Sequence, residues 1–334
     1  MTTLITGATG FIGSRLARRL ANEGESVRVL CRPTADVSAL NDPNIRIVLG
    51  DVLDSAGLGK ALAGCDRVFH LAAYAKNWAK DPTTFIDVNV GGLKRLLSAA
   101  LQASVKKVVF TSSALTLGPS NGQPVSESSV RSAEFFTDYE RSKFIAEQEV
   151  QQYVHAGLDV VIVNPTRVFG PGPLTEGNSA TRMIQWYVEG KLQPILGDGS
   201  LLGNYAYVED VVRGHVLAMQ RGRAGERYTF GGENVSFTEF FRLISEISGK
   251  RHRAFHIPPP LALAIAYAEK LRAEWFNHHP LITPGWVRTF LVDWACSTVK
   301  AERELGYAVT PLRTALESTI SWLEQQRVAT RGKS

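Results

Sequence analysis

The segment that most restricts the fold of this chain is Gly7-Ala8-Thr9-Gly10-Phe11-Ile12-Gly13, which directly follows a short apolar run ending at Thr6. A helical pattern with apolar residues at 11, 16 and 20 comes next. Strand, glycine-rich turn and helix in this order predict a turn that cradles the pyrophosphate of a dinucleotide. Gly7 would permit the tight turn, Gly10 the approach of phosphate, and Gly13 close packing of helix on strand. The alternative is a purely structural turn of small residues, which needs no ligand.

Short apolar runs rich in β-branched residues alternate with helical patterns along the first half of the chain. Expected strands cover residues 4–6, 27–31, 46–49, 67–71, 106–111 and 159–164, and helical patterns cover 85–103 and 139–155. This alternation predicts an α/β fold, a doubly wound parallel sheet with helices on both faces. Ligands of such sheets bind beyond the carboxyl ends of the strands.

The pattern becomes less regular after Pro165. Helices are expected near 237–248 and 311–326, and an apolar stretch over 261–276 predicts an amphipathic helix rather than a membrane span. We therefore predict a dinucleotide-binding domain over 1–165, to which later segments return, and a smaller C-terminal substrate lobe over 166–327. The polar, basic residues 328–334 are expected to be a disordered tail.

A tyrosine and a lysine four residues apart, Tyr139 and Lys143, share one face of the helical pattern that follows residue 138. An ammonium beside a phenol lowers the pKa of the phenol and makes it a usable proton donor or acceptor near neutral pH. Taken alone, most such pairs are merely solvated helix faces. This pair gains weight because it lies downstream of a predicted dinucleotide site.

Several further motifs follow in a consistent order: Gly50-Asp51-Val52, His70-Leu71-Ala72-Ala73, Asp87-Val88-Asn89-Val90, Thr111-Ser112-Ser113-Ala114 and 164–172. With the glycine turn and the Tyr-Lys pair, they make the chain resemble the extended short-chain dehydrogenase/reductases over nearly its whole length. Within this epimerase/dehydratase superfamily it is most similar to the branch of dihydroflavonol reductases, sterol 3β-dehydrogenases and hopanoid-associated sugar epimerases. The resemblance implies a Rossmann fold and a nicotinamide cofactor.

The resemblance also implies the site residues. Ser113, Tyr139 and Lys143 would be catalytic, with Ser113 orienting the substrate oxygen, Tyr139 exchanging its proton and Lys143 holding the nicotinamide ribose. Ser112 is the rival hydroxyl. Residues implied to contact the cofactor are Gly7, Thr9, Gly10, Phe11, Ile12, Gly13, Arg32, Asp51, Val52, Leu71, Ala72, Ala73, Asn89, Thr111, Ser112, Tyr139, Lys143, Pro165 and Val168.

The preferred nucleotide is predicted by the end of the second strand. NAD-specific sites usually place an acid there to bind the ribose hydroxyls, but no acid occurs between Arg28 and Thr34. Arg32 instead provides a guanidinium that can bind a 2′-phosphate bidentately. We therefore expect NADP(H) rather than NAD(H), unless Arg32 is simply a solvated charge at the strand end.

The substrate is less constrained. Sugar-nucleotide enzymes of this superfamily usually carry an arginine where this chain has Gly203, and the segment 205–215 resembles the sterol-dehydrogenase version. Aromatic and apolar residues are expected to line the substrate site, although at each of the aromatic positions taken singly an ordinary core residue is the better interpretation. They are Tyr74, Trp78, Phe169, Met183, Trp186 and Tyr187, beside Ser113. The leading prediction is an NADP(H)-dependent oxidoreductase that acts on a ketone, aldehyde or alcohol of a bulky, fairly apolar substrate. Alternatives are a nucleotide-sugar epimerase or dehydratase and a non-catalytic NADP(H)-sensing regulator.

Composition fits a single enzyme that does not bind nucleic acid. A net charge of +5 is mild and scattered, so nucleic acid is not implied. The cysteines, Cys31, Cys65 and Cys296, show no pairing or metal spacing, and no metal is expected from His278-His279. With no signal peptide or membrane span in the pattern, we expect a cytoplasmic protein. The resemblance implies a homodimer that pairs residues 94–103 and 139–150 in a four-helix bundle.

Overall fold

The computed structural model describes residues 1–174, 178–191, 194–252, 255–276 and 278–331. Its central feature is a seven-stranded sheet in which every neighbouring pair is parallel. The strands are β1 (Thr2–Thr6), β2 (Ser26–Cys31), β3 (Ile45–Leu49), β4 (Arg67–His70), β5 (Lys107–Thr111), β6 (Val160–Pro165) and β10 (Arg227–Phe230). Their order, β10-β6-β5-β4-β1-β2-β3, confirms the doubly wound fold and reverses direction between β1 and β4. A crevice at such a reversal is where these sheets bind nucleotides.

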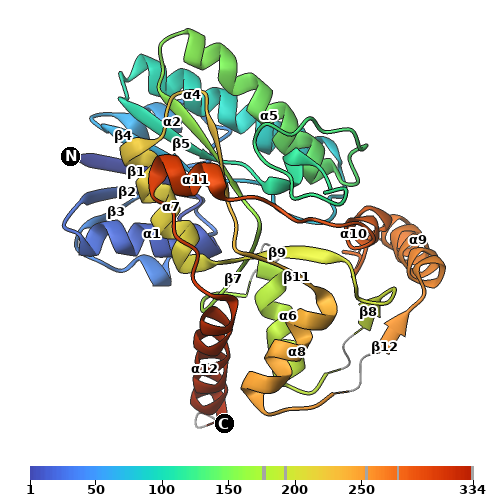
Figure 1. The fold of residues 1–334 in the computed structure, drawn as a ribbon. Helices are drawn as coiled ribbons and strands as arrows, with labels where there is room; N and C mark the ends of the chain where they lie inside the picture. Colours follow the sequence, from blue (N-terminus) through green and yellow to red (C-terminus); the bar gives the residue numbers. More distant parts are fainter. Residues whose placement is uncertain (175–177, 192–193, 253–254, 277, 332–334) are drawn as a thin grey trace.

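Helices cover both faces of this sheet, as Figure 1 shows. One face carries α2 (Ser55–Leu62), α4 (Gly92–Gln102) and α5 (Asp138–His155), which bury Leu62, Leu97 and Val150 against the strands. The other carries α1 (Phe11–Asn22), α7 (Val208–Arg221) and α11 (Val299–Leu305), packed around a second apolar core. With both faces covered, the strands need continuous apolar runs, which explains why their positions were predictable.

The helix expected over 85–103 is divided into three parts. It consists of α3 (Thr83–Ile86), a π-helical turn η2 (Asp87–Gly91) and α4. Such π-turns are frequent at functional sites, and Asn89 lies within this one. Short 3₁₀ turns, η1 (Ser38–Leu40) and η3 (Ala114–Leu117), follow β2 and β5.

A smaller lobe lies beyond the carboxyl ends of the strands (Figure 1). Its three-stranded sheet has the order β11-β9-β7, from β7 (Arg167–Phe169), β9 (Leu202–Tyr207) and β11 (Glu233–Ser236), and β8 (Pro194–Leu196) pairs with β12 (Phe255–Ile257). Helices α6 (Ser179–Val188), α8 (Phe237–Ser248) and α12 (Leu312–Arg331) enclose its apolar core. Helices α9 (Pro259–Phe276) and α10 (Pro284–Thr289) pack against each other beside it.

The chain passes between the two parts several times, because β10, α7 and α11 return to the large sheet whereas α12 belongs to the lobe. The tail expected from Val328 differs from the structure, since α12 continues through Arg331; residues 332–334 lie outside the described part. Among the described helices, none is both long and apolar enough to cross a membrane.

Candidate active site

The glycine turn fits between the ends of β1 and β4 only because Gly7 and Gly13 have no side chains. Gly7 has a φ of +75°, and a Cβ there would lie 2.6 Å from the Ala72 nitrogen. A Cβ on Gly13 would lie 2.2 Å from the Gly7 carbonyl oxygen. The Gly10 N–H closes the turn by donating to the same oxygen at 3.0 Å. Gly7 and Gly13 therefore have the geometric roles expected from the sequence.

This turn leaves the first turn of α1 open for an anion. Gly10 is the N-cap of the 12-residue helix and has no side chain to bond its N–H groups. Unpaired N–H groups and the positive end of the helix dipole suit a pyrophosphate. The tight glycine turn and the open helix end together fit a dinucleotide.

The other residues expected at the cofactor lie around this end of the sheet. Arg32 directly follows β2 and is exposed. Asp51 follows β3, and its carboxylate accepts the Leu53 N–H at 2.9 Å. Leu71 continues from β4 and donates its N–H to the Thr6 carbonyl at 3.0 Å. These residues thus lie at the same edge of the sheet as the glycine turn.

A cavity of about 210 Å³ lies between the sheet and the lobe, and both Ser113 and Tyr139 line it. Ser113 follows β5 and caps η3, while Tyr139 belongs to the first turn of α5. The two hydroxyls interact, and this hydrogen bond favours the ionised phenol. The rival Ser112 points the other way, donating to the buried Glu147 carboxylate at 2.5 Å. Only Ser113 of the two serines faces the cavity among the described lining residues.

Lys143 lies one helical turn after Tyr139 and is buried. Its Nζ donates to the Thr111 carbonyl at 2.8 Å and lies 4.8 Å from the centre of the Phe110 ring. Burial lowers the pKa of Lys143 to about 7, against the opposing effect of the Glu147 charge. The Lys143 ammonium is therefore held at the carboxyl end of β5, two residues before Ser113.

The pKa of Tyr139 differs from the expectation that Lys143 depresses it. Burial raises the pKa of the phenol to about 12, with only the Ser113 hydrogen bond opposing. The physical reason is that desolvation penalises phenolate more than the nearby groups stabilise it. At neutral pH the phenol therefore keeps its proton.

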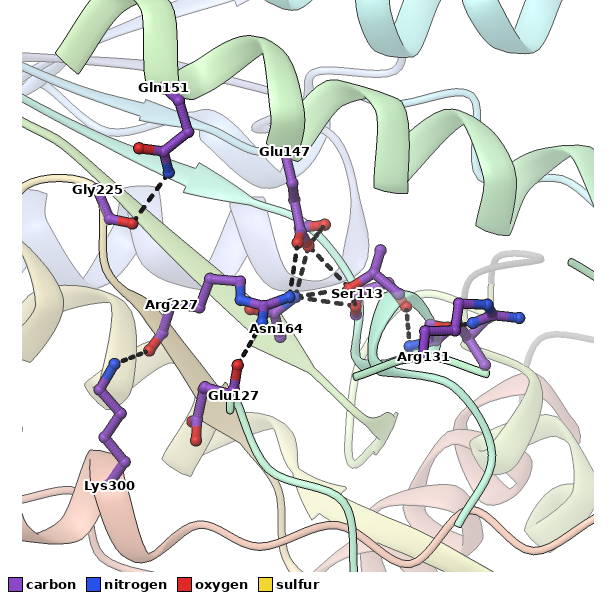
Figure 2. Close-up of polar contacts among 12 residues, drawn as sticks. Ser113, Glu127, Arg131, Glu147, Gln151, Asn164, Gly225, Arg227 and Lys300 are labelled. Carbon is purple, nitrogen blue, oxygen red and sulfur yellow. Dashed lines mark hydrogen bonds and ion pairs between the residues drawn. The ribbon is translucent and has the colours of Figure 1, made fainter. Parts of the chain in front are cut away.

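A buried polar network fixes the strand ends that carry these groups (Figure 2). Glu147, on α5, accepts hydrogen bonds from Ser112, from Thr116 at 2.8 Å and from Asn164 at 2.7 Å. Thr116 and Asn164 also donate to the Ser113 carbonyl, at 2.8 and 3.0 Å. Arg227 approaches the second Glu147 oxygen at 3.4 Å. The network thus ties α5, β5, β6 and β10 together directly behind Ser113.

A second buried pair fixes the start of α5. Glu140 forms a capping box with Thr137 and an ion pair of 2.7 Å with Arg131. Arg131 also donates to the Leu115 carbonyl at 2.6 Å, two residues after Ser113. One guanidinium therefore links the Ser113 turn to the helix end that carries Tyr139. The Thr-x-x-Glu spacing was a visible signal for this cap, whereas the role of Arg131 had none.

Asn89 joins the expected cofactor-side loop to α5. Its side chain accepts the Tyr74 N–H at 2.7 Å and donates to the Ser142 hydroxyl at 2.9 Å. Ser142 directly precedes Lys143. Asn89 thus lies on a helical segment that packs against α5, as expected from the sequence.

The aromatic residues expected at the substrate lie largely elsewhere. Phe169 and Tyr187 are buried in the lobe core, where Tyr187 stacks on Phe241, and Met183 packs against the same core. Tyr74 packs edge-on against Phe85. Trp78 contacts His279, and Trp186 is 40% exposed. Among the described residues that line the cavity, none of these six appears.

The cavity is instead lined by aromatic residues that sequence reasoning missed. They are Trp286 and Phe290, at α10, and Trp294. Gly285 brings α10 close, since a Cβ there would lie 2.2 Å from the Phe136 carbonyl oxygen, just before α5. No spacing in the sequence relates these residues to Tyr139, because only tertiary packing brings α10 to α5. Pro165, Val168 and Arg167 also line the cavity.

Two buried histidines have structural roles. His215 contacts the Val211 carbonyl through Nδ1 at 2.7 Å and the Thr111 hydroxyl through Nε2 at 2.9 Å. Burial lowers the pKa of His215 to about 4 and that of His70 to about 3. Both are therefore neutral, and within the described residues no cluster suited to a metal ion is found.

Comparison with known proteins agrees with this geometry. Residues 3–231 match the model of the NAD dependent epimerase/dehydratase family. Sterol demethylase protein B of Methylococcus capsulatus is 32% identical over 336 residues, covering 98% of this chain and 99% of that protein. A putative dihydroflavonol 4-reductase of Synechocystis is 31% identical over 329 residues, covering 96% and 94%. The crystal structure of gox2253 has a TM-score of 0.82 at 35% identity, covering 97% of this chain and 98% of that one.

The chain therefore belongs to the NAD dependent epimerase/dehydratase family, within the extended short-chain dehydrogenase/reductases. It is an oxidoreductase of the type that depends on a nicotinamide nucleotide.

Proposed function

We propose that this protein is an NADP(H)-dependent oxidoreductase that reduces a ketone or aldehyde of a bulky, fairly apolar substrate, or oxidises the corresponding alcohol. The observation that carries the proposal is that Ser113 and Tyr139 face one cavity whose walls include Trp286, Phe290 and Trp294. Aromatic and apolar walls with few convergent polar groups suit such a ligand.

In this reaction the protein provides the proton and the hydrogen bonds, and the cofactor provides the hydride chemistry. The bound nicotinamide supplies or accepts the hydride, and the carbonyl carbon is the atom reduced. Tyr139 donates its phenolic proton to the carbonyl oxygen, and Ser113 hydrogen-bonds this oxygen while negative charge develops. Lys143 stabilises the phenolate that remains. Because the pKa of Tyr139 is about 12, the resting phenol is already in the proton-donor form that reduction requires.

The preference for NADP(H) is supported by Arg32. This guanidinium is exposed directly after β2, and no acid occurs between Arg28 and Thr34. A carboxylate at this place would repel a 2′-phosphate, whereas an accessible arginine attracts it.

The decisive experiment measures NADPH consumption against ketones, aldehydes, and flavonoid-like and sterol-like carbonyls, with NADH in parallel. Turnover of one class that disappears in Tyr139→Phe, while cofactor affinity stays nearly unchanged, would support the proposal. Loss of cofactor binding in Tyr139→Phe would contradict the role given to the phenol. Turnover with NADH equal to that with NADPH would contradict the cofactor preference.

A second candidate is a nucleotide-sugar epimerase or dehydratase, in which hydride leaves and returns within one turnover. It is favoured by the matching family model, whose members include such enzymes. Tight NADPH binding without net oxidation of any carbonyl would support it, especially if a nucleoside-diphosphate sugar binds. Gly203 weighs against it, since the arginine typical of a diphosphate clamp is missing.

We also propose a homodimer through α4 and α5. Phe144 and Ile145 remain partly accessible on α5, and Leu101 on α4 is 39% exposed. Val150, which we expected to contribute, is buried within the subunit. Light scattering after size-exclusion chromatography tests this: a monomer at micromolar concentration would contradict it, and Ile145→Glu should dissociate a dimer.

A further inference from the structure

We propose that Arg167 forms an anion-binding subsite in the substrate cavity, and that the substrate is a carbonyl or alcohol compound whose apolar body carries a carboxylate. The carbonyl part of this statement rests on the proposed function, whereas the anion subsite follows from the surroundings of Arg167 alone.

Arg167 lies on the wall that the lobe contributes to the cavity. It begins β7, pairs in register with Tyr205 of β9, and lines the same cavity as Ser113 and Tyr139. Its guanidinium carbon is 4.7 Å from the centre of the Phe290 ring, 5.1 Å from that of Phe237 and 5.9 Å from that of Tyr205. Three aromatic rings therefore surround the guanidinium and fix its position.

The guanidinium has no anionic partner in the described part of the protein. Its Nη1 atom is buried without a hydrogen bond, and the described ion pairs do not include Arg167. Among the described residues that line the cavity there is no aspartate or glutamate. Arg167 is partly buried, and the group beside it is the neutral Tyr205 hydroxyl. Because a partly desolvated charge without a counter-ion is unfavourable, a ligand that supplies negative charge would account for this position.

The neighbouring strand leaves room for this arrangement. A Cβ on Gly203 would lie 2.8 Å from the Arg167 Nη1 and 3.0 Å from the Tyr205 ring. Any larger residue at 203 would therefore push the guanidinium away from its present position. The absence of a side chain at Gly203 on β9 thus leaves the space that the Arg167 guanidinium on β7 occupies.

A single carboxylate matches this subsite better than a diphosphate. One guanidinium donates two parallel hydrogen bonds to one carboxylate, and the remaining wall near it is aromatic. A diphosphate has more charge and more acceptor oxygens than this wall can satisfy. Lys76, the other cation that lines the cavity, is exposed and lies in the loop after β4.

The test uses three aryl keto acids, 4-oxo-4-phenylbutanoate, 5-oxo-5-phenylpentanoate and 6-oxo-6-phenylhexanoate, each beside its methyl ester. Binding to the NADP⁺-saturated protein is followed by tryptophan fluorescence, because Trp286 and Trp294 line the cavity. We expect at least one acid to bind at least about tenfold more tightly than its ester, which corresponds to about 1.4 kcal/mol. Arg167→Met should abolish this difference, and Arg167→Lys should retain part of it.

Arg182→Met is the matched control. Arg182 is a partly buried arginine on α6 that is not among the residues lining the cavity, so its loss should leave the preference unchanged. Equal binding of acids and esters by the wild type, no binding of any acid, or a preference that survives in Arg167→Met would overturn the subsite. Even if a variant misfolds, the comparison of acid with ester binding by the wild-type protein still tests whether the cavity binds a carboxylate. Acid binding without NADPH oxidation would instead keep the subsite and refute the reductase.

Discussion

Glu147 provides the sharpest test of how the active site is held together. It is 2% exposed, and one of its oxygens accepts hydrogen bonds from Ser112, Thr116 and Asn164. Glu147→Ala removes this acceptor, which takes from the Ser112 hydroxyl its acceptor and leaves Thr116 and Asn164 with only their other partners, the Ser113 carbonyl among them. Breaking a buried charged cluster in this way costs about 3–5 kcal/mol, a large part of a typical free energy of unfolding of about 5–15 kcal/mol.

Glu147→Gln is the more informative variant because it keeps the shape and removes the charge. Its amide oxygen can still accept hydrogen bonds, whereas its NH₂ group would face Arg227, now 3.4 Å from the carboxylate. We expect a smaller loss of stability, about 1.5–3 kcal/mol, typical of a hydrogen bond to a charged group. Since Thr116 and Asn164 also hold the Ser113 carbonyl, kcat should fall about 10- to 100-fold with little change in KM.

The same variant should move the pH dependence of the reaction. The Glu147 charge raises the pKa of Lys143, which burial lowers to about 7. Without this charge the pKa falls further, so the protonated lysine is lost at a lower pH. In a plot of kcat against pH, the alkaline limb, where activity is lost as Lys143 loses its proton, should therefore shift towards lower pH.

Urea unfolding and pH profiles of kcat with the best carbonyl substrate provide the measurements. Glu23→Gln is the matched control: it lies at the end of α1, away from α4 and α5, and its ion pair with Arg19, at 2.9 Å, is exposed and should contribute below about 1 kcal/mol. If Glu147→Gln resembles Glu23→Gln in stability and rate, or if the pH limb of Glu147→Gln moves towards alkaline pH, Glu147 does not position the Ser113 turn and Lys143.

Three further predictions follow from single positions. In the cofactor-free protein, Lys143→Met should be inactive but at least as stable as the wild type at pH 7. Because the pKa of Lys143 is lowered from 10.5 to about 7 on folding, the unfolded wild type binds more protons than the folded one between these pH values, and its stability should rise with pH in this range. In urea unfolding, the stability advantage of the variant should therefore shrink as the pH rises. Gly13→Ala should weaken nucleotide binding and destabilise the protein, since its Cβ would lie 2.2 Å from the Gly7 oxygen, whereas Gly59→Ala, which meets nothing within 4 Å, should leave calorimetric stability equal or higher. Arg32→Ala should raise the Kd of NADPH about tenfold or more with a much smaller effect on NADH, and equal losses in titration would contradict the role of Arg32.

Much of the large sheet was predictable because local signals and burial agree there. Strands covered on both faces must be apolar along their whole length, and β2, β5 and β6 begin and end within a residue or so of the expected places. The glycine turn was equally predictable, since any side chain at Gly7 or Gly13 would clash with the neighbouring backbone. The family resemblance indicated Ser113, and helical spacing paired Tyr139 with Lys143; the structure brings Ser113 and Tyr139 to one cavity, while their catalytic roles stay a prediction.

The substrate side was predicted less well, for a physical reason. Aromatic residues in the lobe serve equally as core or as cavity wall, and periodicity does not separate the two. Phe169 and Tyr187 are core, whereas Trp286 and Trp294 are wall because α10 folds back onto the start of α5. The pKa of Tyr139 was mispredicted for a similar reason: the spacing to Lys143 was visible, but the depth of burial was not.

Asn89 has a consequence for how the cavity opens. Its side-chain amide accepts the Tyr74 N–H and donates to the Tyr74 carbonyl at 3.3 Å, so it holds the loop whose next residues, 75–77, line the cavity. Lifting this loop would break two hydrogen bonds, at a cost of about 2 kcal/mol, so the lifted form would be only a few per cent of the population. Because the same amide bonds Ser142 next to Lys143, we expect any movement of this loop to displace the part of α5 that carries Lys143.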